Sequence, residues 1–260
     1  LITTIACLIC CIVYTQAQNK DNMLSKKEQS IAAISMYAAR GNQDSLKVIL
    51  ARGLDCGLTV SEEKEVLTQL YAYCGFPRSM GALVTLMNLT KERAAQGIKD
   101  EAGREPSPVK SSDMFVVGGQ NQLKLFGRPA LGEVLTFAPA LDQFLKAHLF
   151  GDIFSRDNLD WRTRELSTVA ALSVLDGVKN ELNTHIAHAK HNGVTQAQID
   201  EVLIMAARCR NGMVLSEVFY KNRYDIMLCA EMYLSKNFNE AQHYAALIIG
   251  QPVRGCERTV

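Results

Sequence analysis

The fold of this chain is decided by the stretch WRTRELSTVAALSVLDGVKNELNTHIAHAKHNGVTQAQIDEVL, residues 161–203. Its apolar residues recur three and four positions apart on both sides of Asp176-Gly177, which indicates two amphipathic helices separated by a short break. The first helix carries a lone acid, Glu165, and the second carries the imidazole of His185. Because helices joined by a short connection pack side by side, we expect these two side chains to meet across the seam.

The pair of Glu165 and His185 is the strongest candidate for chemistry in the sequence. An imidazole can give or take a proton near neutral pH, and a neighbouring carboxylate orients the ring and raises its basicity. Such a pair, with a donor that stabilises an oxyanion, is sufficient for a decarboxylation or an isomerisation through an enolate. The alternative is structural: a first-turn acid satisfied by the helix backbone, and a hydrogen-bonded histidine in a seam.

The composition is that of a folded, nearly neutral protein. The chain has 260 residues, of which 48% are hydrophobic, so it has room for one large domain or two small ones with real cores. Lys and Arg number 28 against 27 Asp and Glu, a formal net charge of +1. No overall field therefore favours nucleic acid or an acidic membrane surface, and a small neutral or anionic substrate is the better match.

The N-terminal stretch predicts an export signal. Residues 1–14 form an uncharged apolar run, and Thr15 and Ala17 are small residues at the two positions that a signal peptidase reads. The run is shorter than the about 20 residues of a membrane span, which disfavours an anchor helix. We predict a cleaved signal, no membrane span after cleavage, and a periplasmic or secreted protein. The run lacks a preceding basic segment, so we expect the natural chain to begin upstream of Leu1.

The cysteines do not form a disulfide framework. Three of the eight lie in the predicted signal, and five remain, an odd number at wide spacings and without a C-x-x-C pair. Neither a dithiol redox centre nor a zinc ribbon is indicated, and a buried structural thiol is the expectation for each. The five are Cys56, Cys74, Cys209, Cys229 and Cys256.

A second group of candidates surrounds a helix break in the first half. Cys74 lies directly before Gly75 and Pro77, so its thiol is a candidate nucleophile near a helix end. Tyr71 and Arg78 flank it, and an arginine there could bind a substrate carboxylate. The alternative interpretation places Cys74 and Tyr71 in the core and Arg78 on the surface.

The remaining sequence is helical in pattern, apart from one connection. Residues 99–113, KDEAGREPSPVKSSD, have the composition of a linker, and residues 115–133 indicate an irregular connection that is strand-like at its ends. The C-terminal part is either a specialised extension that packs on a neighbouring subunit, or an end whose sequence has diverged because its coding sequence is read differently. The predicted organisation is a signal peptide, 1–18; a first helical unit, 19–97; a linker and irregular connection, 98–134; a second helical unit, 135–205; and a helical C-terminal extension, 206–260.

Two segments of the chain are copies of one helical pattern. Residues 46–67, LKVILARGLDCGLTVSEEKEVL, align without a gap with residues 182–203, LNTHIAHAKHNGVTQAQIDEVL, and Gly57 matches Gly193. Internal similarity of this kind predicts a tandem repeat in which each unit covers the apolar face of the other.

Only the second copy carries both members of the candidate pair. Ile49 is the counterpart of His185, so Glu28, if it matches Glu165, has no imidazole partner. The simplest interpretation is one chemically competent copy and one scaffolding copy.

The repeated segments resemble a known family. TREL, AAL, ELNTH and HNGVTQAQIDEVL in the second half, and LDCGLTVSEEKEVLTQLYAYCGFPRSMGAL in the first, are similar to the carboxymuconolactone decarboxylase family, which shares its fold with alkyl hydroperoxidase D. The resemblance covers residues 28–203, and FLKAHLFGDIF, residues 144–154, resembles the lead-in to the second unit. It implies an all-α fold of tandem alkyl hydroperoxidase D-like units, assembled as a trimer or hexamer with sites near subunit interfaces.

The resemblance also carries residue roles. In the peroxidase branch of the family, a glutamate on one helix precedes a C-x-x-C-x-x-x-H segment on the next. Glu165 and His185 resemble that glutamate and that histidine, whereas the cysteine positions fall near Val178 and near Glu181 or Leu182. Without the dithiol, the resemblance points to the decarboxylase branch, which uses acid, base and electrostatic groups on an unsaturated lactone acid and needs no cofactor.

Three histidines at positions 185, 188 and 191 raise the question of a metal site. Residues three apart share one flank of a helix, but two such steps rotate the third ring away from the first, and a site would need a ligand from elsewhere. We therefore predict no metal site, and we expect His188 and His191 to face solvent.

The sequence as a whole predicts an exported, homo-oligomeric, all-α enzyme that performs cofactor-independent lyase or proton-transfer chemistry on a small carboxylate or lactone. In this interpretation His185 is the general acid/base, Glu165 orients it, and Arg78 and Tyr71 bind the substrate. One alternative is thiol-dependent peroxide reduction through Cys74. The other is a non-catalytic oligomeric binding or scaffold protein.

Overall fold

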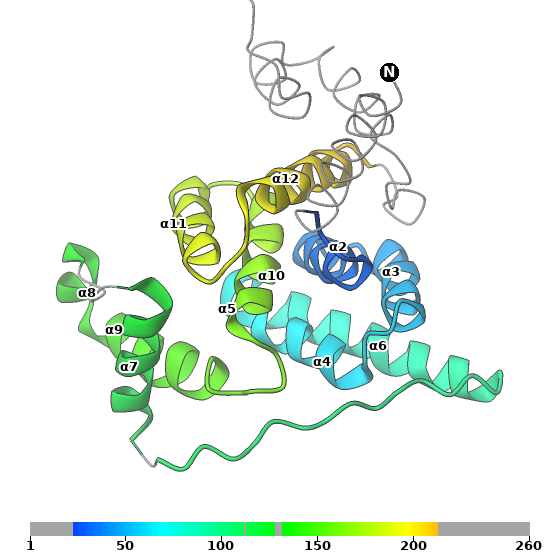
Figure 1. The fold of residues 1–260 in the computed structure, drawn as a ribbon, viewed down its shortest axis with the longest axis horizontal. Helices are drawn as coiled ribbons and strands as arrows, with labels where there is room; N and C mark the ends of the chain where they lie inside the picture. Colours follow the sequence, from blue (N-terminus) through cyan, green and yellow to red (C-terminus); the bar gives the residue numbers. More distant parts are fainter. Residues whose placement is uncertain (1–22, 112, 128–131, 213–260) are drawn as a thin grey trace, which may run out of the picture.

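A computed structural model describes residues 23–111, 113–127 and 132–212 (Figure 1). Within these ranges every regular element is a helix, which confirms the predicted all-α class. None of the described helices is both long and apolar enough to cross a membrane. The predicted signal peptide, and the predicted extension beyond Gly212, lie outside the described residues.

The elements follow one another with short connections, except between α6 and α7. In chain order they are α2 (Lys26–Arg40), α3 (Gln43–Asp55), α4 (Val60–Gln69), α5 (Tyr71–Cys74), α6 (Phe76–Ala95), α7 (Met114–Phe126), α8 (Glu133–Phe137), α9 (Pro139–Phe144), the π-helix η1 (Leu145–Ile153), α10 (Trp161–Ser173), α11 (Lys179–His191) and α12 (Gln196–Arg210).

The helices repeat as the sequence copies do. Helices α3 and α11 begin at residues that the gapless alignment pairs, and so do α4 and α12. Gly57 and Gly193 take the same left-handed conformation, with φ of 91° and 92°, which residues with a side chain rarely adopt. Thr59 and Thr195 then start α4 and α12 with the same capping box. The tandem organisation is therefore built from two copies of one three-helix pattern.

The core lies where the first helices of the two units meet. Helices α2 and α10 lie side by side in the centre of Figure 1, and residues 29–39 of α2 and 163–173 of α10 are all buried. Both helices are rich in alanine and serine, which lets their backbones approach closely. The hydroxyls of Ser35 and Ser167 lie 2.8 Å apart across this contact. Each unit thus buries the apolar face of the other, as the repeat predicts.

A buried polar network joins the units next to this core. Arg164 of α10 is fully buried and donates to Glu65 of α4 at 2.8 Å and to the side-chain carbonyl of Gln69 at 3.0 Å. Arg156 donates to both oxygens of the same Glu65 carboxylate. Burial alone would raise the pKa of Glu65, but the hydrogen bonds from Arg156 and the charge of Arg164 hold it below its usual value. The network fixes α10 against the first unit.

The long connection from α6 to α7 contains residues 98–111, where the sequence predicts a linker, and no helix forms there. It runs back along α4 in Figure 1, where the carbonyls of Glu101 and Ala102 accept hydrogen bonds from the backbone N–H groups of Val60 and Ser61. These N–H groups belong to the first turn of α4. The N–H groups of a first helical turn have no hydrogen-bond partners within their own helix. The linker is therefore held by the helix that it passes.

The prediction of an irregular, strand-like connection over residues 115–133 is wrong for its first part, which forms α7. Asp113 caps the helix by accepting a hydrogen bond from the N–H of Val116, and Gly127 ends it in the left-handed conformation. The glycines that suggested a loop serve packing instead. A Cβ on Gly118 would lie 1.7 Å from the carbonyl oxygen of Lys146, so only glycine lets α7 approach η1 this closely.

The helix break that the sequence indicates at Gly75 and Pro77 lies between α5 and α6. Leu70 separates α4 from α5, and α6 begins at Phe76. Proline is tolerated in the first turn of a helix because its missing N–H has no partner there, so Pro77 lies inside α6 rather than before it.

Candidate active site

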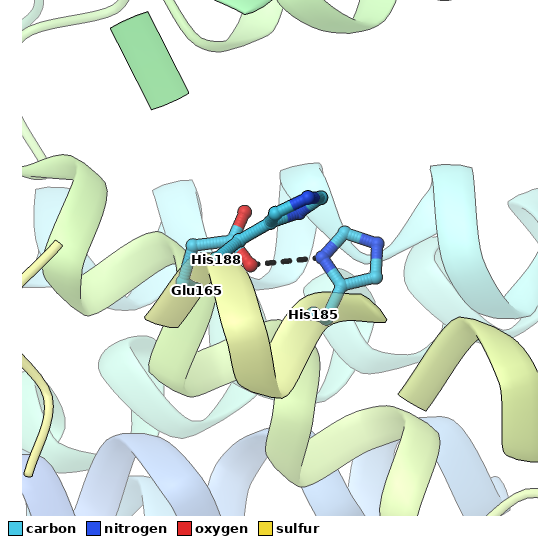
Figure 2. A group of neighbouring side chains, drawn as sticks. All are labelled: Glu165, His185 and His188. Atoms are coloured by element: carbon cyan, nitrogen blue, oxygen red, sulfur yellow. Dashed lines mark hydrogen bonds and ion pairs between the residues drawn. The ribbon is translucent and has the colours of Figure 1, made fainter. Parts of the chain in front are cut away.

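Glu165 of α10 and His185 of α11 meet in the second unit, as the sequence predicts. The Nδ1 atom of His185 lies 2.8 Å from Oε2 of Glu165 (Figure 2). The Glu165 side chain is fully buried, and that of His185 is 14% exposed. A buried carboxylate therefore holds an imidazole that remains partly accessible.

Helix α10 is capped at its start, and the turn from α10 to α11 is held by α12. Asp160 caps α10 by accepting a hydrogen bond from the N–H of Thr163, and Gly177 turns the chain between the helices with a φ of 79°. Arg210 at the end of α12 donates to the carbonyls of Ser173 and Leu175 in the turn. The relative position of the pair is thus set by the third helix of the same unit.

A tyrosine from the first unit completes the surroundings of the pair. The ring of Tyr73 in α5 lies edge-on to His185, with 5.3 Å between ring centroids, and its hydroxyl oxygen is buried. Burial, and after it the negative charge of Glu165, raises the pKa of Tyr73. The hydroxyl is therefore a neutral hydrogen-bond donor. The sequence prediction did not place Tyr73 at the pair, because this contact joins residues of different units.

A comparison with known protein families places the chain in one of them. The model of the carboxymuconolactone decarboxylase family matches residues 13–86 and again residues 139–218, together more than half of the chain. The chain belongs to the carboxymuconolactone decarboxylase family. The two matches confirm the tandem form, and the second one contains the pair of Glu165 and His185. No curated protein matches the sequence.

In this member of the carboxymuconolactone decarboxylase family, the two positions that resemble the peroxidase cysteines carry other residues. Val178 precedes the first turn of α11, Glu181 is exposed in that turn, and Leu182 packs against the core. None of these side chains can form a disulfide or a thiolate, so the motif around His185 offers no dithiol chemistry.

The other predicted site residues make contacts elsewhere. The thiol of Cys74 is half-buried and donates to the carbonyl of Leu70, and burial raises its pKa. Tyr71 stacks on Phe76, with 4.4 Å between ring centroids. Arg78 is exposed and donates to the carbonyl of Ala39. Within the described part of the chain, none of Cys74, Tyr71 and Arg78 hydrogen-bonds to the pair.

The expectation that His188 faces solvent is wrong. His188 is 8% exposed, and its ring stacks on Phe126 of α7 at 3.9 Å between centroids, with a 13° angle between the ring planes. The reason is that α7 is a helix and covers this side of α11, where Asn192 donates to the carbonyl of Leu125. His191, one turn further on, is exposed as predicted.

The first unit has no equivalent pair. Ile49, the counterpart of His185, is fully buried in the core. Glu28 forms a capping box with Ser25 and an ion pair with Arg162. Burial alone would raise the pKa of Glu28, but the hydrogen bonds from Ser25 and Arg162 keep it below its usual value. Glu28 is thus a helix-capping residue.

Proposed function

We propose that this protein is a cofactor-independent lyase or proton-transfer enzyme that acts on a small carboxylate or lactone. In this proposal His185 is the general acid/base and Glu165 orients it. The observation that carries the proposal is the 2.8 Å contact between Nδ1 of His185 and a fully buried Glu165 carboxylate. The family membership supports enzymatic activity of this class.

The contact assigns a role to each atom of the pair. When the Glu165 carboxylate accepts the Nδ1–H of His185, the lone pair of the neutral imidazole is on Nε2. In an isomerisation, Nε2 takes a proton from the carbon beside the substrate carbonyl, an enolate forms, and Nε2 returns the proton at another carbon. The imidazolium that exists between these steps is stabilised by the adjacent carboxylate.

A decarboxylation uses the same groups in a different order. The bond between the carboxylate carbon and its neighbour breaks, carbon dioxide leaves, and the electron pair moves into the conjugated carbonyl to give an enolate. The protonated His185 then donates its proton to carbon. In both reactions the hydroxyl of Tyr73 would donate a hydrogen bond to the enolate oxygen, a role that suits a tyrosine whose pKa is raised.

The peroxidase alternative has no observation in its favour. The nucleophile in such chemistry is a thiolate, whereas burial raises the pKa of Cys74 and its thiol donates to a backbone carbonyl. The alternative that we keep is the non-catalytic scaffold, which is the function to expect if the protein shows no turnover.

We also propose that the protein is exported and assembles as a homo-oligomer. Export is proposed from the apolar N-terminal run alone. A second copy would cover four exposed apolar side chains that follow one side of α6. These are Phe76, Met80, Val84 and Met87.

The proposed chemistry is tested by following carboxymuconolactone and simple unsaturated lactone acids in D₂O by proton NMR. This experiment detects both loss of carbon dioxide and hydrogen exchange beside the carbonyl. His185→Asn should lower the rate by about 100-fold or more, because general acid/base catalysis contributes about that much. Glu165→Gln should also lower it, since an amide can hold the wrong tautomer.

The matched control is His191→Gln, because His191 is an exposed histidine on the same helix. This variant should keep the wild-type rate. Full activity in His185→Asn would refute the assignment of the base. Absence of both reactions in the folded wild-type protein would favour the scaffold alternative.

A further inference from the structure

The face of α11 that holds His185 also presents His188, and the two rings flank the carboxylate of Glu165 (Figure 2). We propose that Glu165, His185 and His188 form a binding site for a divalent transition-metal ion of the Zn²⁺ type. This site goes beyond the proposed proton-transfer function, because it needs His188 as a third ligand. From the sequence alone we predict no metal site, because the histidines of one helix would need a further ligand from elsewhere, and Glu165 of α10 lies where it could be that ligand.

The spacing of the three side chains suits one ion. One possible ligand atom from each residue lies within 4.8 Å of the other two. Ligands about 2.0–2.2 Å from a tetrahedral zinc ion lie roughly 3.3–3.5 Å apart, so small side-chain rotations close the site. His185 and His188 are three residues apart on α11 and share one face, while Glu165 approaches from α10. The ligands therefore come from two helices that pack directly against each other.

The second observation concerns the other oxygen of Glu165. Its Oε1 atom is buried and has no hydrogen-bond partner among the described residues, although Oε2 is bound to His185. A buried acceptor without a partner costs free energy, and a cation between Oε1 and the imidazoles would remove that cost. This unsatisfied oxygen points to a bound ligand more directly than the spacing does.

The donor set indicates which ion would bind. Two imidazoles and one carboxylate suit Zn²⁺, Ni²⁺ or Fe²⁺, whereas Mg²⁺ and Ca²⁺ prefer oxygen ligands alone. Three protein ligands leave at least one coordination position for water or for an oxygen of a bound molecule, as in reactive zinc sites. The buried surroundings of Glu165 and His188, which are 0% and 8% exposed, would exclude competing water.

Occupancy would have a consequence for the proposed reaction. The ion would displace the proton between His185 and Glu165, because a metal ligand must be deprotonated. If the proposed proton-transfer function holds, the ion then competes with the catalytic proton and inhibits turnover reversibly. This consequence rests on the proposed function, whereas metal binding itself does not.

The test is a titration of EDTA-dialysed full-length protein with Zn²⁺ by calorimetry, without any substrate. We expect one ion per chain with a dissociation constant below about 10 μM. His188→Gln should weaken binding by about 100-fold or more, since the loss of a ligand costs at least as much as the loss of a residue that supports one. The matched control, His191→Gln, should bind as the wild type does.

A second measurement keeps the proposal testable if His188→Gln does not fold. X-ray absorption of the Zn²⁺-loaded wild-type protein should show two imidazole nitrogens and carboxylate oxygen around the ion. Binding weaker than about 1 mM, a spectrum without imidazole, or equal affinity in His188→Gln and the wild type would overturn the proposal. Because these readouts involve no turnover, their failure is distinguishable from failure of the proposed reaction.

Discussion

Glu63 is a buried ionisable group that the fold does not need, and replacing it with a side chain that does not titrate should stabilise the protein near neutral pH. The residue is 1% exposed, and both carboxylate oxygens are buried without a hydrogen-bond partner among the described residues. Its side chain fits only because Gly53 faces it, since a Cβ there would lie 2.3 Å from Oε1. The second unit has Ile199 at the equivalent position, also buried, so the helix pattern tolerates an uncharged residue.

The direction of the effect follows from the pKa of Glu63. Burial, and after it the charge of Asp100, raises this pKa well above its usual value, and Arg93 opposes the shift only partly. Glu62 adds a further negative charge. The folded protein therefore keeps a proton that the unfolded chain releases. At pH values below the pKa that Glu63 has in the unfolded chain, this proton stabilises the folded protein fully. The stabilisation is lost as the pH rises through the pKa that Glu63 has in the folded protein.

The size of the effect is set by one proton. Between the unfolded and the folded pKa of Glu63, the wild type loses about 1.4 kcal/mol of unfolding free energy per pH unit. Glu63→Gln has the same shape and does not titrate. The unfolding free energy of this variant minus that of the wild type should therefore rise with pH, by up to about 1.4 kcal/mol per pH unit.

Urea unfolding at a series of pH values from 5 to 8 measures this difference. The matched control is Glu92→Gln, because Glu92 is exposed and its surface ion pair with Lys47 contributes at most about 1 kcal/mol. The difference between the control and the wild type should not grow with pH. A Glu63→Gln difference that stays constant or falls as the pH rises would show that Glu63 is ionised in the folded state and would refute the reasoning.

Three other changes test the packing and the assembly. Arg164→Met leaves the buried Glu65 without its closest partner, so it should lower the unfolding free energy in urea by about 3–5 kcal/mol. A loss below about 1 kcal/mol would contradict a stabilising role of Arg164. Gly118→Ala should lower the melting temperature. The overlap of the new Cβ with the Lys146 carbonyl costs about 1–3 kcal/mol, whereas alanine stabilises a helix by only roughly 1 kcal/mol relative to glycine. If the proposed oligomer forms through α6, Met80→Glu should give monomers in light scattering. The substitution should leave the melting temperature of the monomer unchanged, since the side chain is 61% exposed.

The sequence could predict the features that depend on local pattern. The helices of the two copies begin and end at the same kinds of residue, such as the left-handed Gly57 and Gly193. Such helix ends can be predicted because they depend on only a few neighbouring residues. The meeting of Glu165 and His185 followed from one break between two helices, and the structure confirms it.

The sequence could not predict features that depend on packing between distant segments. Gly118 resembles a loop residue until η1 is placed against it, and α7 was therefore missed. The burial of His188 depends on that same helix, because Phe126 of α7 covers its ring. Tyr73 of the first unit contacts His185 of the second, so its role at the pair depends on how the two units pack. Each of these errors has one cause: the contact joins segments that the local pattern treats separately.

The difference between the two units argues for function in the second. When the repeat alignment is extended, the counterpart of Tyr73 is Cys209, a thiol whose pKa burial raises to about 11. The counterpart of His185 is the fully buried Ile49. The first unit thus shows that this helix pattern packs well with an apolar residue in place of His185, and the second unit shows that it packs well with an inert thiol in place of Tyr73. The second unit instead buries a carboxylate with one oxygen unsatisfied, which costs about 1–3 kcal/mol. The most direct explanation for this cost is that the Glu165 carboxylate acts together with His185, as the proposed function and the proposed metal site both require.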